Sequence, residues 1–194
     1  MPVLKGSKTA ENLMKAFVGE SQARNRYTFY ASQAKKDGFV QISNIFLETA
    51  GNEKEHAEMF FKYLNVQFQG QEVAVNATYP IGLSDTLAEL NYAADGEKAE
   101  HSVLYPRFAK VAKEEGFNDI AQTFEMIATV EGRHEARFRA LIENIKNDKV
   151  FKKDTPVLWK CINCGYITEA LEAPKVCPAC KHPQSYYQVY TQEY

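Results

Sequence analysis

Residues 53–60 read Glu53-Lys-Glu-His56-Ala-Glu-Met-Phe60, and residues 131–138 read Glu131-Gly-Arg-His134-Glu-Ala-Arg-Phe138. A glutamate and a histidine three positions apart lie on the same face of a helix. Gly19-Glu20 precedes the first stretch, and Gly96-Glu97 precedes the second at nearly the same interval. One glutamate from each of two helices and a Glu-x-x-His pair from each of two others form the ligand set of a two-metal carboxylate site. The sequence therefore predicts a four-helix bundle that holds a pair of metal ions.

The similarity between the two halves extends beyond these candidate ligands. After a one-residue slip, the matched pairs are Gly38-Phe39 with Gly116-Phe117, Ile42 with Ile120, Phe46 with Phe124, and Phe60 with Phe138. An internal duplication explains this pattern most simply. Two incidental surface histidines would not be expected to recur in register with their glutamates.

Apolar residues at helical spacing predict helices over residues 7–36, 41–64, 86–115 and 118–146. Ser7 or Thr9 can cap the first helix, and Asp37-Gly38 can end it. Residues 67–83 break the period and are too long for a turn, so we expect a crossover between two helical pairs.

The later helices carry two candidate caps and one internal proline. Thr86-x-x-Glu89 is typical of a capping box, and Asn118 is a candidate cap for the last helix. Pro106 is expected to kink the third helix or to shift its hydrogen bonding locally.

The candidate ligands are expected to meet at one depth of the bundle. Glu20 lies about 24 Å before the first turn and Glu53 about 20 Å after it, at roughly 1.5 Å per residue. Glu97 and Glu131 stand in nearly the same relation to the turn near residue 116. Several buried carboxylates without a counter-charge would destabilise the fold strongly, so metal ions or protons must compensate.

Glu100 makes the two halves unequal, because its counterpart by the repeat is Ala23. It lies one turn after Glu97 and is expected on the same face. A fifth carboxylate would favour the more highly charged, oxidised metal pair. We therefore predict that Glu100 changes its coordination with oxidation state, the alternative being a solvated glutamate beside His101.

Composition narrows the class of protein. The net charge of −2, with both signs interspersed, predicts neither a nucleic acid nor a membrane as partner. The chain starts without a signal-peptide pattern and has no apolar run long enough to span a bilayer. We expect a cytoplasmic protein, and in that compartment cysteines are better interpreted as metal thiolates than as disulfides.

All four cysteines lie near the C-terminus, as Cys161-x-x-Cys164 and Cys177-x-x-Cys180. Two such pairs predict a tetrahedral metal site in a small domain that depends on the metal to fold. Residues 148–157 are polar and lysine-rich, as in a linker. Spacing alone leaves zinc and iron open, but attachment to a redox-active bundle favours one iron, which is a one-electron centre.

With these residues, and with Cys164-Gly165-Tyr166 and Cys177-Pro178-Ala179-Cys180-Lys181-His182-Pro183, the chain resembles the rubrerythrins over its whole length. The resemblance implies a ferritin-like di-iron bundle over residues 1–147, a linker over 148–157, and a rubredoxin-like domain over 158–194. It also implies two iron ions in the carboxylate site and one iron in the four-cysteine site. The expected fold class is thus an all-α four-helix bundle with a small C-terminal β domain.

The resemblance further implies a non-haem peroxidase that reduces hydrogen peroxide to water. Glu53 and Glu131 would bridge the iron pair, Glu20 and Glu97 would be terminal ligands, and His134 would bind one iron throughout. The other iron would exchange His56 for Glu100 on oxidation. Tyr27 and Tyr105 would donate hydrogen bonds to the carboxylates, although aromatic core packing would also explain them.

Electrons would return through the cysteine-bound iron, with the rubredoxin-like domain of one subunit near the di-iron site of the other in a head-to-tail homodimer. His182 is a candidate for this path or an exposed histidine without a role. The donor would be a separate rubredoxin or a flavin NAD(P)H reductase, because the chain has no Gly-rich dinucleotide loop. Two alternatives stay open: a ferroxidase that oxidises and deposits iron, and an adaptor protein with a structural zinc ribbon.

Overall fold

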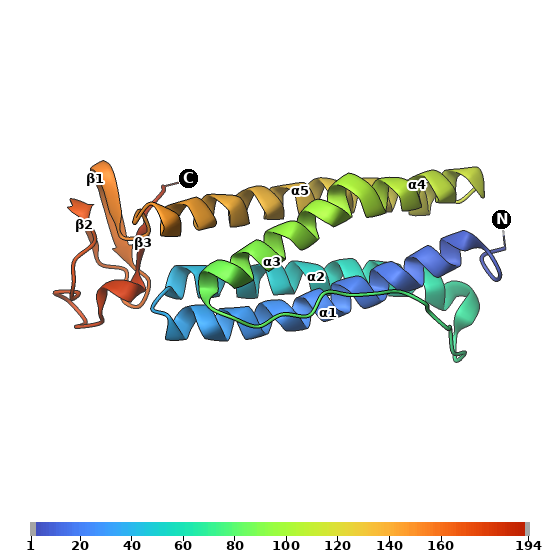
Figure 1. Cartoon of the computed structure of the whole chain (residues 1–194), viewed down its shortest axis with the longest axis horizontal. Helices are drawn as coiled ribbons and strands as arrows, with labels where there is room; N and C mark the ends of the chain where they lie inside the picture. Colours follow the sequence, from blue (N-terminus) through green and yellow to red (C-terminus); the bar gives the residue numbers. More distant parts are fainter. Residues whose placement is uncertain (1–2, 193–194) are drawn as a thin grey trace.

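The computed structural model describes residues 3–192 and shows an elongated bundle with a small sheet at one end (Figure 1). The helical part has four columns, of which the third is interrupted. The columns are α1 (Lys8–Lys36), α2 (Val40–Phe68), α3 (Thr86–Ala99) continued by η1 (Glu100–Leu104) and α4 (Tyr105–Glu114), and α5 (Asn118–Lys146). The predicted four-helix bundle with a small C-terminal β domain is confirmed.

The sheet is antiparallel, and its strand order is β2-β1-β3. Its elements are β1 (Lys152–Cys161), β2 (Ile167–Glu172), the 3₁₀ turn η2 (Gln184–Tyr186) and β3 (Tyr187–Val189). Strand β1 starts inside the range 148–157 that was predicted as a linker. The sheet end of the molecule is joined to the bundle by a stacked pair of rings, Phe39 and Phe151, whose centroids are 6.1 Å apart.

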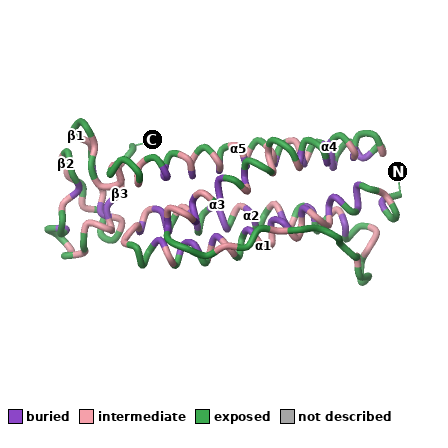
Figure 2. Tube along the Cα trace, viewed as in Figure 1, coloured by how far each residue is buried: buried purple, intermediate pink, exposed green. Residues whose placement is uncertain are grey.

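Two apolar clusters fill the bundle and leave a polar layer between them. One cluster contains Leu13, Phe60 and Phe124, and the other contains Tyr30, Phe46 and Phe138. Buried residues accordingly lie on the helix faces that point into the bundle (Figure 2). Helices α1 and α2 form one hairpin, and the α3–α4 column pairs with α5. A crossover that follows α2 carries the chain along the bundle to α3 (Figure 1).

The helix ends test the predicted caps. Ser7 caps α1 by accepting a hydrogen bond from Ala10 N–H, and Gly38 ends the hairpin turn with φ of 88°, as predicted. Helix α2 runs four residues beyond the predicted end at Leu64.

Two predicted caps were wrong. The N-cap of α3 is Asp85, not Thr86, because Thr86 donates its hydroxyl and its N–H to Asp37 at the end of α1. Asn118 is already the first residue of α5, after an N-cap Phe117 that forms no side-chain cap. Both helices start one residue away from the predicted position. The causes are the contact of Thr86 with Asp37 in one case and the turn before Asn118 in the other, and local propensity shows neither.

The third column contains a π-helical turn, η1, which ends at Leu104, two residues before Pro106. A π turn accommodates one more residue than an α turn, and such turns often occur at functional sites. The repeat offset changes across it: Glu97 follows Glu20 by 77 positions, whereas Tyr105 follows Tyr27 by 78. The one-residue slip in the sequence repeat is therefore located in η1, and the predicted shift in hydrogen bonding near Pro106 is confirmed.

Among residues 3–192, no helix combines the length and the apolar character that a membrane crossing requires.

Candidate metal centres

The polar layer at mid-bundle contains four glutamates and a histidine that are almost fully buried. Glu20 and Glu131 are 0% exposed, Glu53 and Glu97 are 1% exposed, and His134 is 5% exposed. Each helical column supplies at least one of them, at the depth predicted from the rise per residue. Four buried carboxylates in one layer are unfavourable unless cations or protons neutralise them.

Glu53 and Glu131 lie at the centre of this layer, because each turns one oxygen toward each histidine. From His56 Nδ1, Glu53 Oε2 is 3.0 Å away and Glu131 Oε1 is 2.9 Å away. From His134 Nδ1, Glu53 Oε1 is 3.2 Å away and Glu131 Oε2 is 2.8 Å away. Two carboxylates in this arrangement can each span a pair of metal ions.

The donor atoms fall into two groups that share these two glutamates. One group is Glu20, Glu53, His56 and Glu131, and the other is Glu53, Glu97, Glu131 and His134. Within each group the donor atoms lie within 4.8 Å of one another. Carboxylate and imidazole donors suit iron, although they also accept zinc and manganese.

Several of these atoms have no other role in the fold. Glu20 Oε2, Glu53 Oε1, Glu97 Oε2, both oxygens of Glu131 and His134 Nδ1 are buried without a hydrogen-bond partner in the described chain. Native proteins rarely leave buried polar atoms unpaired, and each such atom calls for an explanation. Atoms that converge without pairing with one another fit a pair of metal ions.

The pKa values of this layer also reflect buried carboxylates that lack a counter-charge. Burial, followed by the charge of Glu53, raises the pKa of Glu97 to about 8, and burial also raises that of Glu20. Burial would lower the pKa of His56, but the adjacent carboxylates of Glu131 and Glu53 raise it to about 9. Without metal, protons therefore take over the neutralisation that cations would supply.

Two tyrosines connect the halves of the layer reciprocally. Tyr27, from α1, donates its hydroxyl to Glu97 on α3 at 2.5 Å, and Tyr105, from α4, donates to Glu20 on α1. Both side chains are 1% exposed and also pack against aromatic rings. The sequence offered packing and hydrogen bonding as alternatives, and the structure combines them. Hydrogen bonds of this kind orient carboxylates that bind metals.

Phenylalanine in place of Tyr27 is expected to leave the bundle folded and to weaken iron retention by about 10- to 100-fold. Glu97 would keep its position but lose the donor that orients it. Tyr30→Phe is the matched control, since this equally buried tyrosine of α1 donates to the carbonyl of Gly82 instead. Competition of each iron-loaded variant against a chelator measures the effect. Equal retention by Tyr27→Phe and wild type would contradict the positioning role.

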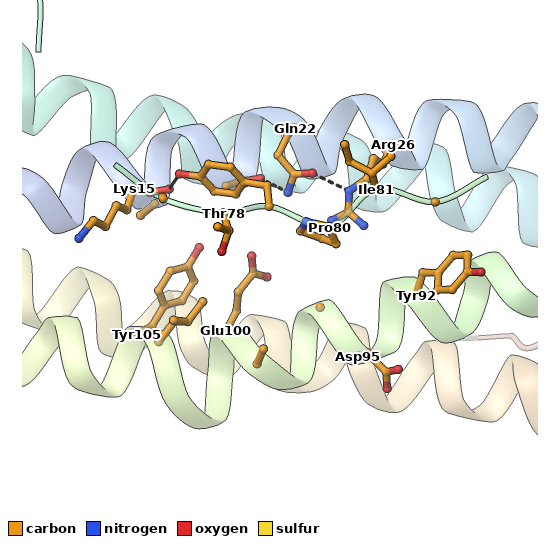
Figure 3. A pocket seen from close by; sticks show the side chains of 18 of the residues that line it. Lys15, Gln22, Arg26, Thr78, Pro80, Ile81, Tyr92, Asp95, Glu100 and Tyr105 are labelled. Atoms are coloured by element: carbon orange, nitrogen blue, oxygen red, sulfur yellow. Dashed lines mark hydrogen bonds between the residues drawn. The ribbon is translucent and has the colours of Figure 1, made fainter. Parts of the chain in front are cut away.

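Glu100 belongs to neither donor group, and it lies at the edge of the layer. It lines a cavity of about 590 Å³ between α1, the crossover and the third column. Figure 3 shows Glu100 and Tyr105 extending from the third column toward α1, near the crossover residues Thr78 and Pro80. Burial, then the charge of Glu97, raises the pKa of Glu100, so it faces the same negative layer. The geometry places Glu100 within reach of the layer but apart from the clustered ligands.

The sequence analysis missed the polar residues around this cavity. Arg26 donates to Gln22 at 2.6 Å, and both line the cavity that contains Glu100 (Figure 3). The positive charge of Arg26 lowers the pKa of Glu100, against the larger effects of burial and neighbouring carboxylates. The i, i+4 spacing of Gln22 and Arg26 was the only available signal, and many surface helices share it.

The four cysteines form a second centre at the sheet end. Cys161 Sγ and Cys180 Sγ are 3.7 Å apart, as are Cys164 Sγ and Cys177 Sγ. These separations are far too long for disulfides and match the edge of a tetrahedron with metal–sulfur bonds of about 2.3 Å. The backbone N–H of His182 lowers the pKa of Cys180 to about 6 and favours its thiolate form. The four sulfurs are thus arranged for one metal ion, and the surroundings of Cys180 already favour its thiolate form.

Comparison with known proteins decides the family. The rubrerythrin family model matches residues 11–142, and the model of the rubrerythrin rubredoxin-like domain matches residues 159–188. The chain belongs to the rubrerythrin family. It is 59% identical to rubrerythrin of Clostridium perfringens over the whole of both chains. It is 48% identical to rubrerythrin of Nitratidesulfovibrio vulgaris, with 97% of each chain covered.

Solved structures agree with the fold of a rubrerythrin. A mixed-valence nigerythrin structure superposes with a TM-score of 0.65 at 30% identity, covering 95% of this chain and 87% of that chain. An open-pore ferritin of Archaeoglobus fulgidus, at 18% identity and a TM-score of 0.61, shares the fold of the bundle. With the donor sets described above, the chain carries two irons in the carboxylate site and one iron in the four-cysteine site. Like other rubrerythrins, it is an oxidoreductase.

Proposed function

We propose that this rubrerythrin is a non-haem peroxidase that reduces hydrogen peroxide to water and so protects against oxidative stress. One observation carries the proposal: a single chain combines two donor groups sharing Glu53 and Glu131 with a four-cysteine centre. Reduction of one peroxide consumes two electrons and two protons and yields two waters. The iron pair supplies both electrons when it is bound, and the cysteine-bound iron returns them one at a time.

We assign the ligand roles as follows. Glu53 and Glu131 would each hold both ions, a role supported by their distances to both histidines. Glu20 and Glu97 are terminal ligands, and Tyr105 and Tyr27 hold their carboxylates. His134 binds one ion in both oxidation states.

His56 would hold the second ion in the reduced site, and Glu100 would replace it as a ligand in the oxidised site. Two features of the structure support this assignment. His56 has the more accessible ring, with 13% of its side chain exposed against 6% for His134. Glu100 lines the cavity outside the clustered donors, yet the charges of Glu97, Glu131 and Glu53 act on it. An added carboxylate compensates the higher charge of the oxidised pair, which is the direction of exchange that electrostatics requires.

Glu100 also lies where a peroxide would arrive. The cavity that it lines extends to Lys15 at one end and to Asp95 and Tyr92 on another side. Because burial raises its pKa, Glu100 holds a proton more readily than a surface glutamate. We propose that its carboxyl delivers one of the two protons that the reaction consumes.

The electron route involves a second copy of the chain. Along α5, the twelve residues from His134 to the helix end span about 18 Å, and the cysteines lie beyond that end (Figure 1). A head-to-tail dimer would bring the four-cysteine centre of one subunit closer to the carboxylate layer of the other. We propose His182, whose Nδ1 lies 3.2 Å from the carbonyl oxygen of Cys180, as part of this route. The donor would be a rubredoxin or a flavin NAD(P)H reductase in the cytoplasm.

The decisive experiment is anaerobic stopped-flow oxidation of the fully reduced, iron-loaded protein. Hydrogen peroxide and dioxygen are mixed with it separately, while the absorbance of each iron centre is followed. We expect oxidation at least about tenfold faster with peroxide, equivalent to about 1.4 kcal/mol in activation free energy. Both centres should be oxidised in turn, the carboxylate site first.

Two results would contradict the proposal. Faster oxidation by dioxygen, with ferrous iron consumed as substrate, would indicate a ferroxidase. A four-cysteine centre that stays unchanged while the carboxylate site is oxidised would exclude it from the electron route. Chemical reduction of that centre alone then distinguishes a structural site from a disconnected one.

A further inference from the structure

Tyr187 is a buried residue that packs beside the cysteine centre. It is the first residue of β3, it pairs with Cys161 across the β1–β3 ladder, and its side chain is 0% exposed. It belongs to one buried cluster with Trp159, Cys161 and Cys177. Packing alone explains an aromatic ring at this position, but it does not explain a hydroxyl.

The hydroxyl of Tyr187 is buried and has no hydrogen-bond partner in the described part of the chain. Buried tyrosine hydroxyls normally find a partner, because an unpaired polar group in the interior costs free energy. The neighbouring Trp159 follows this rule, since its Nε1–H donates to the carbonyl of Ala170 at 3.0 Å. The unpaired hydroxyl therefore needs a hydrogen-bond acceptor, and we expect this buried site to provide one when metal is bound.

The candidate acceptor is the sulfur of Cys177, which lies in the same buried cluster as Tyr187. The effect of Cys177 on the pKa of Tyr187, second only to burial in raising it, agrees with this placement. In turn, the Tyr187 hydroxyl leads the contributions that lower the pKa of Cys177 and outweigh its burial. A neutral thiol is a weak acceptor, but a cysteine that binds a metal is a thiolate with full acceptor strength. Metal binding thus supplies the missing partner.

We propose that the Tyr187 hydroxyl donates an O–H···S hydrogen bond to the iron-bound thiolate of Cys177 and raises the reduction potential of this centre. Reduction adds one electron from the external donor to the iron, while no bond breaks and the phenol keeps its proton. The added negative charge spreads onto the sulfurs, so a hydrogen-bond donor stabilises the reduced form more than the oxidised form.

This bond would distinguish Cys177 from the other sulfurs. Backbone N–H groups of Ala179 and Cys180 already interact with Cys177, and those of Asn163 and Cys164 interact with Cys161 in the same way. The two knuckles therefore provide equivalent backbone donors, and Tyr187 adds a third donor on one side only. The side chain at this position sets the potential independently of the knuckle backbone.

The test is Tyr187→Phe in the full-length, iron-loaded protein. Its midpoint potential is measured by spectroelectrochemistry on the sulfur-to-iron charge-transfer absorbance, without peroxide. We expect the equilibrium constant for reduction to fall by up to about tenfold, which is about 59 mV for one electron. Tyr186→Phe is the matched control, because it removes the neighbouring hydroxyl and keeps the ring that contacts His182.

An unchanged or higher potential in Tyr187→Phe, or an equal fall in Tyr186→Phe, would overturn the proposal. If Tyr187→Phe does not retain iron, 3-fluorotyrosine at position 187 decides the question. Its more acidic hydroxyl is a stronger donor, so the potential should rise above that of the wild type, and no rise would refute the bond. Since peroxide is absent, this outcome is independent of whether the chain is a peroxidase.

Discussion

Glutamine in place of Glu131 is expected to release iron from both positions of the carboxylate site and to lower peroxide turnover by more than about 100-fold. The substitution keeps the shape of the side chain and removes its charge. Glu131 contacts both histidines, at 2.9 and 2.8 Å, so one change affects both donor groups. A terminal ligand such as Glu20 belongs to one group only, and its loss should affect mainly one ion.

Iron content per chain and steady-state peroxide reduction measure the effect of Glu131→Gln. The matched control is Glu143→Gln on the same helix, where the side chain is exposed and outside both donor groups. The control should keep three irons per chain and wild-type turnover. The cysteine-bound iron should remain in both variants, because its ligands lie beyond the C-terminal end of α5. Retention of both carboxylate-site irons in Glu131→Gln would refute the bridging role.

Iron-free protein is expected to lose stability as the pH rises between about 5 and 9, with a fall in melting temperature of at least about 5 °C. The folded-state pKa of Glu97 is raised to about 8, so its carboxyl must ionise in a buried site as the pH passes from 4.5 to 8. For His56, with its pKa raised to about 9, the stabilisation is complete below 6.5 and is lost as the pH rises through 9. In both cases the folded state binds more protons, so stability declines with pH.

The other groups of the carboxylate layer do not reverse this slope, and the opposite contribution of Cys180, with its pKa lowered to about 6, belongs to the cysteine centre at the sheet end. His134, with its pKa raised to about 12, adds to it above pH 6.5. Glu131 has a lowered pKa, and its contribution is lost only below its ordinary value of 4.5, outside this range. Iron binding should change the behaviour, because the ligands must be deprotonated to bind, so affinity grows with pH.

Thermal unfolding of the chelator-treated and iron-loaded proteins across this pH range provides the measurement. The iron-loaded protein should show a flat or rising melting temperature. Glu97→Gln is the control for the assignment, since the iron-free variant lacks one of the titrations and should show a shallower slope. A melting temperature of the iron-free protein that rises with pH would contradict the raised pKa values.

The repeat made the fold and the clustered ligands predictable. Glu53 and Glu131 lie close together and each faces both histidines, while the bridging role predicted for them stays a prediction. Their i, i+3 partners follow from helix geometry alone. The sequence could also indicate the depth of the layer, because rise per residue is nearly constant in a helix.

What could not be predicted depends on contacts between distant residues. Thr86 has the residue type of an N-cap, but its hydroxyl donates a hydrogen bond to Asp37 at the end of α1. Asp85 caps α3 instead. Arg26 and Gln22 become part of the cavity only because the crossover covers them (Figure 3). Tyr187 lies opposite Cys161 through the β1–β3 pairing and shares a buried cluster with Cys177, although these segments have no common local signal.

The π turn η1 has a consequence for the symmetry of the molecule. A duplicated gene would at first produce two identical halves, and therefore two equivalent metal positions related by a pseudo-twofold axis. The two halves depart from that equivalence in two ways at this place: Glu100 stands opposite Ala23, and one residue is gained within η1. Only the second half therefore places an extra carboxylate beside the shared layer. The pseudo-twofold symmetry is broken in this one turn, while the matched glutamates and histidines of both halves keep their places.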